Sequence, residues 1–154
     1  KMDFENAQKI KEKIGLLSNY QSKSAIVNSK ISNVDVFSIC SEKTFSFVNY
    51  LKITNGSVIL SHTVEIKKKL EEKDEDILEF VITDLRKRFN SVSKEIFCSI
   101  YVDDVWGNIK LSVPKIGDKK KLIDLSLRNA KYMQLEKKKR AILDKENKDK
   151  VTIL

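Results

Sequence analysis

The chain has 154 residues, of which 34% are charged and 41% are apolar, and it contains only four glycines and one proline. This composition is typical of a single ordered domain with a real core and excludes a disordered chain. Its formal net charge is +8. No run of about 18 apolar residues occurs, which excludes a membrane-spanning helix, and we expect no secretory signal at the polar N-terminus.

The first predicted element is an amphipathic helix over residues 3–17. Asp3 can cap it. Its apolar residues recur at spacings of three or four: Phe4, Ala7, Ile10, Ile14 and Leu17. Such a narrow stripe packs on its own domain or pairs with a partner helix, and the pattern alone favours the first use. Residues 18–33 are mostly polar and predict a continuation of the helix or a linker.

Three strands are predicted next, over residues 34–40, 44–54 and 57–66. Asn55-Gly56 separates the last two and is the dipeptide that most strongly favours a two-residue hairpin turn. This turn pairs Thr54 with Ser57. The register that follows is Ile53 with Val58, Leu51 with Leu60, Asn49 with His62, Phe47 with Val64, and Phe45 with Ile66. Most of these pairs are apolar on both sides, so the turn and the hydrophobic face agree.

A helix is predicted after a charged connection, with Asp74 as its cap and Asn90-Ser91 as its end. One broad face of this helix is apolar: Ile77, Leu78, Val81, Ile82, Leu85 and Phe89. Arg86, Lys87 and Arg88 occupy its last turn, where cations complement the helix dipole. The helix dipole alone therefore explains why these three basic residues occur in the last turn.

Residues 95–102 predict a fourth strand, residues 103–108 a turn, and residues 109–113 a fifth strand. A long helix follows from about residue 118. The resulting order β-β-β-α-β-β-α predicts an α/β (α+β) fold with a ribonuclease H-like mixed sheet. The inner face of the long helix is predicted from Leu122, Leu125, Asn129 and Met133, and beyond Gln134 its pattern is almost wholly polar, so we expect that part to project or fray.

The loop and helix at residues 114–154 carry most of the net positive charge. Residues 114–154 hold 13 of the 30 basic residues against six acids, whereas residues 1–113 hold 17 bases against 16 acids. A run of like charge is often only a solvated helix face, and that alternative stays open.

The start of the long helix favours a second interpretation. Pro114 and Gly117 bracket a turn, and Asp118 is a candidate N-cap. Lys119, Lys120 and Lys121 crowd the first turn, where cations oppose the helix dipole, so stability alone does not explain them. Backbone N–H groups and ammonium groups that converge at one helix end suit a phosphate.

Cysteine and histidine content restricts the chemistry. Cys40 and Cys98 both fall in apolar, strand-like runs and lie far from any other ligand-like pair, so they cannot form a zinc site. We interpret them as buried free thiols of a cytosolic protein. His62 is the only histidine, which leaves no histidine-based triad or metal cluster, and we expect it to be hydrogen-bonded in the core or at the sheet end.

Two stretches resemble segments of one known family, the UvrC excinucleases. Residues 3–14 (Asp-Phe-Glu-Asn-Ala-Gln-Lys-Ile-Lys-Glu-Lys-Ile) resemble the second half of the UVR motif, Phe-Glu-x-Ala-x-x-Leu-Arg-Asp-x-Ile. Residues 113–122, together with Leu127-Arg128-Asn129-Ala130, resemble the segment Pro-x-x-Gly-x-Lys-x-x-Leu…Asn-Ala. The two together, in this order, are much more specific than the UVR pattern alone.

The resemblance implies a middle fragment of a bacterial, cytoplasmic repair protein that cuts damaged DNA on both sides of a lesion. The family's nuclease centres lie in a GIY-YIG domain and a helix-hairpin-helix endonuclease domain, and we find neither pattern in this chain. The implied parts are a UVR-type helix and linker (residues 1–33), a ribonuclease H-like domain (residues 34–130) and a basic helical extension (residues 131–154). Many relatives also have a helix between the fourth and fifth strands, for which residues 103–108 are too short.

The family's partner and substrate are carried over onto matching positions. The resemblance implies that one face of the first helix binds UvrB, the helicase-like partner that marks the lesion, through Phe4, Glu5, Ala7, Ile10 and Ile14. We expect sequence-independent contacts with the phosphates of damaged DNA from Lys115, Lys119, Lys120, Lys121, Arg128 and Lys131. No cofactor, metal or catalytic residue is expected in this fragment, nor any membrane contact.

A ribonuclease H-like sheet also raises the alternative of an active nuclease. Active members bind two Mg²⁺ ions with carboxylates from the first strand, a helix and the fourth strand. The candidates are Asp35, then Glu79 or Asp84, then Asp103 or Asp104. However, Val36 and Phe37 offer no further carboxylate, and Asp103-Asp104 also suits a turn.

Three hypotheses therefore stand side by side. The first is a non-catalytic segment that docks UvrB and positions DNA. The second is an active metal-dependent nuclease, which needs the candidate carboxylates to converge. The third is a protein-interaction module without DNA binding, whose basic tail only keeps the chain in solution.

Overall fold

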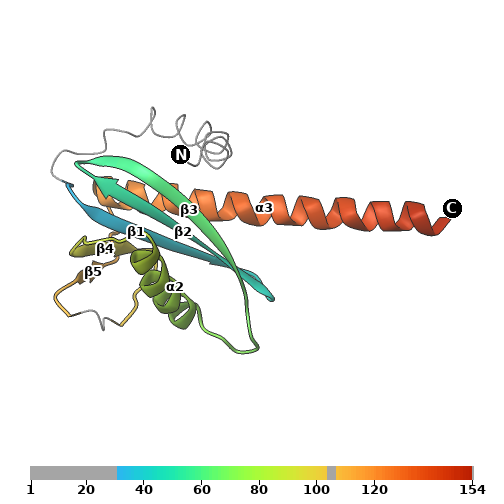
Figure 1. Ribbon diagram of the computed structural model, residues 1–154, viewed down its shortest axis with the longest axis horizontal. Coiled ribbons are helices and arrows are strands. Elements are labelled where there is room, and N and C mark those ends of the chain that lie inside the picture. The colour runs from blue at the N-terminus through green and yellow to red at the C-terminus, as the bar shows by residue number, and fades with distance from the viewer. Residues whose placement is uncertain (1–30, 104–106, 154) are drawn as a thin grey trace, which may run out of the picture.

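The computed structural model describes residues 31–103 and 107–153 of the chain (Figure 1). Its elements, in order, are β1 (Val34–Ser41), β2 (Phe45–Thr54), β3 (Ser57–Lys67), α2 (Asp74–Arg88), β4 (Glu95–Cys98), β5 (Lys110–Ser112) and α3 (Gly117–Ile153). This order confirms the predicted β-β-β-α-β-β-α arrangement. The predicted helix over residues 3–17 and the segment up to residue 30 lie outside the described residues.

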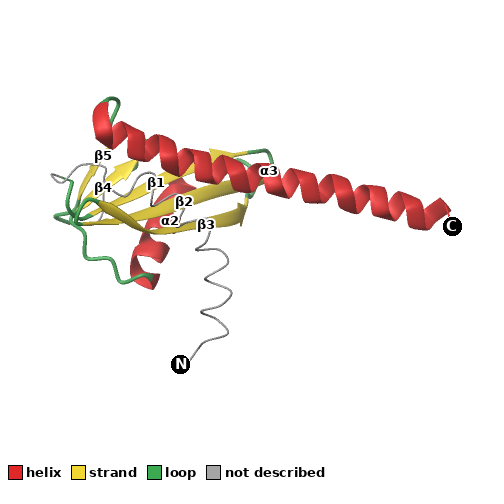
Figure 2. Ribbon diagram, turned by 90° about the horizontal axis from the view of Figure 1, so that it is seen from above, coloured by secondary structure: helices red, strands yellow, loops and turns green. Residues whose placement is uncertain are grey.

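The five strands form one mixed sheet in the order β3-β2-β1-β4-β5. β1, β2 and β3 form an antiparallel meander, whereas β4 lies parallel to both β1 and β5. α2 covers one face of the sheet and α3 covers the other, which gives three layers (Figure 2). In the part of the chain that the structure describes, neither helix is long and apolar enough to cross a membrane.

Each face of the sheet has its own hydrophobic core, because alternate side chains of a strand point to opposite faces. Along β1, Phe37 and Ile39 pack toward α2, and Val34 and Val36 pack toward α3. The α2 core also contains Val48, Tyr50, Leu78, Val81, Ile82, Leu85, Ile96 and Cys98, and the α3 core contains Leu51, Ile53, Val58, Phe97, Leu122 and Ile123. β1 is therefore buried on both faces from Val34 to Ile39, where neighbouring side chains fix the position of each residue.

The predicted hairpin between β2 and β3 is present. Asn55 and Gly56 have φ of 52° and 77°, the two positive values that a type I′ turn requires. Thr54 pairs with Ser57 and Ile53 pairs with Val58, as predicted.

Beyond that point the predicted register is wrong by one residue. A β-bulge between Lys52 and Ile53 leaves Ile59 out of the pairing, so that Lys52 pairs with Leu60. The observed pairs are Leu51 with Ser61, Asn49 with Thr63, Phe47 with Glu65, and Phe45 with Lys67. Because side chains alternate, the shift turns Leu60, Val64 and Ile66 of β3 toward the α2 core, and turns Ser61 and Glu65 toward α3.

α2 differs from its prediction at the start and agrees with it at the end. Lys73 is the N-cap and Asp74 is the first helical residue, whose carboxylate accepts a hydrogen bond from Ser41 Oγ at 2.6 Å. Asn90 has φ of 52°, and Ser91 N donates to Arg86 O at 2.8 Å. These two features form a Schellman turn, which ends the helix and fixes the position of Ser91.

β4 and β5 are shorter than predicted. β4 ends at Cys98 instead of continuing to Val102, because only Asp35, Val36 and Phe37 of β1 pair with it. Beyond the strand, Ser99 Oγ accepts a hydrogen bond from Ile39 N at 3.3 Å and so takes the place of a ladder bond.

α3 is one long helix that lies across the sheet and then continues beyond it (Figure 1). Gly117, with φ of +80°, begins it, so that Asp118 lies within the first turn instead of capping it. Leu122, Ile123, Ser126 and Ala130 are its buried residues, whereas the predicted Leu125, Asn129 and Met133 are half-buried. The helix passes residue 131 without a break, so the predicted boundary there stays a prediction.

Candidate functional site

Asp35 is the only strand residue among the predicted metal ligands, and the structure buries it completely on the α2 side of β1. Its carboxylate accepts a hydrogen bond from Tyr50 Oη at 2.9 Å on Oδ1. Its Oδ2 bonds Arg86 Nη1 and Ser91 Oγ. Both carboxylate oxygens are thus occupied by side chains of the chain itself.

Arg86 reaches Asp35 from the last turn of α2. Its Nη2 donates to Ser93 O at 2.7 Å, so the guanidinium is held from both sides. The Arg86 side chain is only 11% exposed and the Asp35 side chain is fully buried. An ion pair taken out of water in this way is stable only when further hydrogen bonds satisfy it, and Tyr50, Ser91 and Ser93 supply them. We name Asp35, Arg86, Tyr50 and Ser91 the Asp35 cluster.

The Asp35 cluster also affects Tyr50. Burial, together with the nearby Asp35 carboxylate, holds the pKa of Tyr50 well above its usual value. The phenol therefore keeps its proton at neutral pH and acts as a hydrogen-bond donor to the carboxylate.

The other carboxylates predicted as metal ligands do not join Asp35. Asp84 forms an ion pair with Arg88 at 2.8 Å on the surface of α2, and Asp103 is exposed beyond β4. Glu79 is half-buried on α2, and Asp104 lies outside the described residues. Within residues 31–103 and 107–153, no group of three His, Cys, Asp or Glu side chains is placed to hold a metal ion.

The lysines predicted to bind phosphate lie around the start of α3. Lys119 Nζ stands 5.3 Å from the centre of the Phe97 ring, and Lys121 Nζ lies 3.6 Å from Asp118 Oδ1. Lys120 forms an ion pair with Asp124, four residues along the helix. Exposed pairs of this kind contribute little, so they leave these ammonium groups available to an anion. Lys115 is exposed in the preceding loop.

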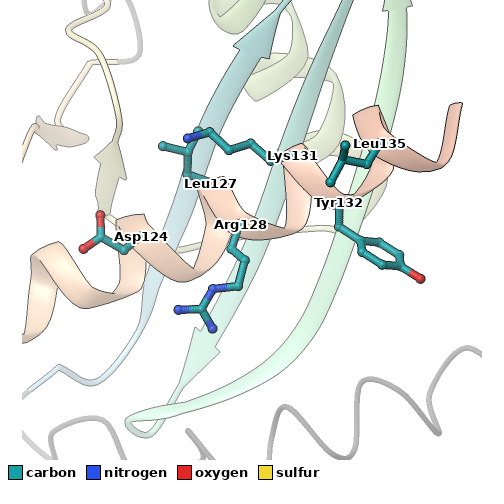
Figure 3. A pocket seen from close by; sticks show the side chains of 6 residues that line it. All are labelled: Asp124, Leu127, Arg128, Lys131, Tyr132 and Leu135. Carbon is teal, nitrogen blue, oxygen red and sulfur yellow. The ribbon is translucent and has the colours of Figure 1, made fainter. Parts of the chain in front are cut away.

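Arg128 and Lys131 lie further along the same helix. They line a pocket of about 410 Å³ together with Asp124, Leu127, Tyr132 and Leu135 (Figure 3). In that view Arg128 and Tyr132 project to one side of α3, and Leu127 and Lys131 project to the other. Ten residues of helix separate Lys121 from Lys131, or about 15 Å. The predicted basic residues therefore extend from the start of α3, where four of the six lie, along the helix to Lys131.

Sequence reasoning missed a buried polar network that fixes α3 on the sheet. Ser126 Oγ lies 2.7 Å from Ser38 Oγ and donates to Asn49 Oδ1 at 2.8 Å. Asn49 Nδ2 in turn donates to Thr63 Oγ1 at 2.8 Å. The signal for this network was present in the sequence, because Ser38, Asn49 and Ser126 are single polar residues within apolar stretches, where a buried polar group needs a partner.

Further along α3, polar contacts replace apolar packing. Lys137 Nζ lies 2.7 Å from Glu65 Oε2 and 3.8 Å from the centre of the Phe45 ring. Lys138 Nζ lies 3.2 Å from Glu42 Oε1. These contacts place the helix against β3 and the β1–β2 turn up to residue 138, which is why a segment with an almost wholly polar sequence stays in contact with the sheet.

Both cysteines are free thiols, as predicted, and Cys98 is the buried one. Burial raises the pKa of the Cys98 thiol to about 12. Cys40 is half-buried and donates to Gln134 Oε1 at 3.1 Å. His62 pairs with Tyr50 across the sheet instead of with Asn49, and its ring meets Phe89 edge-on at 5.2 Å.

The residues predicted to bind a partner protein all lie outside the described residues: Phe4, Glu5, Ala7, Ile10 and Ile14. Their assignment stays a prediction.

Comparison with known proteins gives one consistent family. The model of the UvrC Ribonuclease H-like domain matches residues 33–138. The chain is 55% identical over 138 residues to UvrABC system protein C of Flavobacterium johnsoniae, a match that covers 90% of this chain and 23% of that protein. It is 48% identical over 141 residues to the same protein of Bacteroides thetaiotaomicron, with 91% and 23% covered.

The comparisons also set limits. The chain spans about a quarter of the length of these curated relatives. Among solved structures, an endonuclease V of Ciona intestinalis in complex with DNA is similar with a TM-score of 0.34 and 12% identity, over 57% of this chain and 46% of that one. A likeness of this size carries no inference about function.

Proposed function

The chain belongs to the family of the UvrC ribonuclease H-like domain, and from this premise we propose that it is a non-catalytic middle segment of a UvrABC system protein C. In this role it takes part in bacterial nucleotide excision repair: it docks UvrB through the helix that the sequence predicts over residues 3–17, and it holds damaged DNA near nuclease domains that lie elsewhere. It needs no cofactor for either task.

The Asp35 cluster is the observation that carries the non-catalytic part of the proposal. A metal-dependent nuclease needs several carboxylate oxygens that converge on open space, where Mg²⁺ keeps some of its water. Asp35 is fully buried, and its oxygens are bonded to Arg86, Tyr50 and Ser91. A guanidinium therefore occupies the side of the carboxylate that a cation would need.

Cleavage and metal binding test this part directly. The 154-residue chain, incubated with a lesion-containing duplex in millimolar Mg²⁺, should leave the DNA uncut, and calorimetry should detect no Mg²⁺ binding. Cleavage that disappears in Asp35→Asn while Mg²⁺ binding weakens would establish the alternative, an active ribonuclease H-like nuclease.

The basic line along α3 supports the DNA-positioning part. Lys115, Lys121, Arg128 and Lys131 are exposed; Lys115 lies in the loop before α3, and the other three extend over about three turns of the helix. Basic side chains spaced along a helix can contact successive phosphates of a DNA backbone, and such contacts give affinity for DNA without sequence preference.

Binding measured in a salt series separates this proposal from a module that binds only protein. Phosphate contacts release condensed counterions, so the logarithm of the DNA-binding constant should fall linearly with the logarithm of the salt concentration. Equal affinity for unrelated sequences is expected. The absence of DNA binding at low salt would favour the protein-interaction module instead.

A further inference from the structure

The exposed surface of α3 carries large apolar side chains, both where the helix lies against the sheet and where it continues beyond it (Figure 1). Tyr132, Leu135, Ile142 and Leu143 are 57%, 54%, 60% and 56% exposed. Single exposed apolar residues are common on soluble proteins, but four on one helix face are a pattern that needs an explanation. The residues that α3 buries against the sheet lie on the opposite face and include Ser126 and Ala130.

Three of these side chains, Tyr132, Leu135 and Ile142, belong to a regular seam, and Leu143 lies beside it. Residues on the outward face recur at spacings of four, three, four, three and four: Arg128, Tyr132, Leu135, Lys139, Ile142 and Glu146. We name these six residues the outer seam. Alternating spacings of three and four are those of the contact positions in a two-helix coiled coil, where such positions meet a second helix.

Lysines at intervals of seven residues line one flank of the outer seam. Lys131, Lys138 and Lys145 each immediately precede a seam residue. Lys138 also contacts Glu42 at 3.2 Å, yet its side chain is 58% exposed. Flanking charges of this kind decide which helix a coiled coil accepts, because they meet charges on the flank of the partner. This flank selects acidic residues.

A second copy of α3 fits the outer seam poorly. In an antiparallel pair, the flank with Lys131, Lys138 and Lys145 would face the same three lysines of the other copy. In a parallel pair, Lys131 would meet Glu136, but Lys138 would meet Leu143. The charges therefore point away from self-association.

We propose that the outer seam docks an acidic amphipathic helix of another protein. The apolar residues of that helix pack on Tyr132, Leu135 and Ile142, and its carboxylates face Lys131, Lys138 and Lys145. Nucleic acid is the less favoured occupant, because large aliphatic side chains at Leu135 and Ile142 have no counterpart in a phosphate backbone. Arg128 and Lys131 belong both to this surface and to the basic line of the DNA proposal, whereas the lysines at the start of α3 belong to the DNA proposal alone.

A pair of synthetic peptides tests the proposal on the 154-residue chain. Both are four-heptad helices with leucine at the contact positions; one carries glutamate on both flanks and the other carries lysine. Fluorescence anisotropy at physiological salt should show that the glutamate peptide binds at least about tenfold more tightly than the lysine peptide.

Variants of exposed residues locate the binding surface. Leu135→Ser combined with Ile142→Ser should weaken binding of the glutamate peptide by about tenfold or more. Lys131→Glu, Lys138→Glu and Lys145→Glu together should reverse the preference toward the lysine peptide. The matched control changes three lysines near the start of α3, Lys115, Lys120 and Lys121, to glutamate. This control has the same net charge as the variant with glutamate at positions 131, 138 and 145, but its affinity for the glutamate peptide should stay within about twofold of that of the unchanged chain. Circular dichroism verifies that each variant keeps its fold.

Four results would overturn the proposal. The first is equal binding of the two peptides. The second is unchanged peptide binding in the Leu135→Ser, Ile142→Ser variant. The third is a dimer in sedimentation experiments that dissociates in this variant, because the occupant would then be a second copy. The fourth is a loss of DNA affinity in this variant as large as in the control with three glutamates, because the seam would then be a nucleic-acid surface.

Discussion

The guanidinium of Arg86 closes over the carboxylate of Asp35, so that the last turn of α2 and the first parallel strand of the sheet share one buried ion pair. The Schellman turn after α2 adds Ser91 to the same carboxylate. The way in which α2 ends therefore determines which groups bond to Asp35. An active nuclease with this fold would need a metal ligand at this position of the first strand.

Arg86→Leu should destabilise the fold by about 3–5 kcal/mol, because it leaves the buried Asp35 carboxylate without its cation. Urea denaturation followed by circular dichroism measures the loss. Arg88→Leu is the matched control, since its partner Asp84 lies on the surface, where an ion pair contributes at most about 1 kcal/mol.

Asp35→Asn in the Arg86→Leu background should restore part of the lost stability, because it removes the uncompensated charge. Equal destabilisation by Arg86→Leu and Arg88→Leu would show that the Asp35 cluster does not hold the two layers together.

Ser126→Ala should cost about 1–3 kcal/mol, although it removes a single oxygen. The change takes away the donor to Asn49 Oδ1 and the partner of Ser38 Oγ, both of which are buried. Thermal or urea denaturation measures the change in the free energy of unfolding. Ser112→Ala on the edge strand β5 is the control and should change it by less than about 0.5 kcal/mol. Similar effects of the two substitutions would contradict a structural role for the network.

The hairpin shows how far local sequence reasoning reaches. Asn55-Gly56 predicts the turn because both residues accept a positive φ, and that requirement is local. The turn alone does not predict the register of the whole hairpin. The bulge at Ile59 depends on which side chains of β3 pack against α2 and which against α3, and these contacts are not local. With Leu60, Val64 and Ile66 turned toward α2, Ser61 faces α3 and accepts a hydrogen bond from Asn129 Nδ2 at 3.1 Å.

The candidate site shows the same limit. Arg86, Lys87 and Arg88 all lie in the last turn of α2, where the helix dipole favours a cation at each position equally well. The local sequence therefore does not show which of the three forms a buried ion pair. The role of Arg86 depends on Asp35, 51 residues away. Likewise, the sequence predicts which residues of α3 are basic, but their arrangement along a line depends on the face that Ser126 and Ala130 bury.

Stability should fall in alkaline solution as the pH rises from about 9 toward 12. Burial raises the pKa of the Cys98 thiol from its ordinary 9.0 to about 12. Between these values the unfolded chain has lost this proton and the folded chain has kept it. The free energy of unfolding therefore decreases with pH, by about 1.4 kcal/mol per pH unit for one group.

Cys98→Ala isolates this contribution. The variant should be less stable at pH 8, because it loses buried volume, but its stability should depend less steeply on pH between 9 and 12. Urea denaturation in a pH series measures both. Parallel curves for the two proteins would rule out the Cys98 thiol as a source of the alkaline loss. Tyr50, whose pKa is also raised by burial, keeps its contribution in both.

Neutralising Lys119, Lys120 and Lys121 to Gln should flatten the salt dependence of DNA binding by up to about 0.9 in slope for each lysine that no longer meets a phosphate. Sequence preference should stay unchanged, because phosphate contacts carry none. The control changes Lys67 at the end of β3, together with Lys68 and Lys69 after it, to Gln and so lowers the net charge equally. If both triple variants change the slope alike, overall charge is responsible and the start of α3 has no specific role.

Phe4→Ala should weaken binding of UvrB by about tenfold or more in a UvrC that is otherwise intact, because burial of one such side chain contributes about 1.5–3 kcal/mol. The physical reason is the apolar stripe of the helix predicted over residues 3–17, on which Phe4 is the largest side chain of the proposed interface. Surface plasmon resonance with immobilised UvrB measures the change. Lys11→Ala, on the opposite face of the same predicted helix, is the control and should leave the dissociation constant within about twofold. Unchanged affinity in Phe4→Ala would show that UvrB uses another surface, whereas equal losses in both variants would indicate that the helix itself had been disturbed.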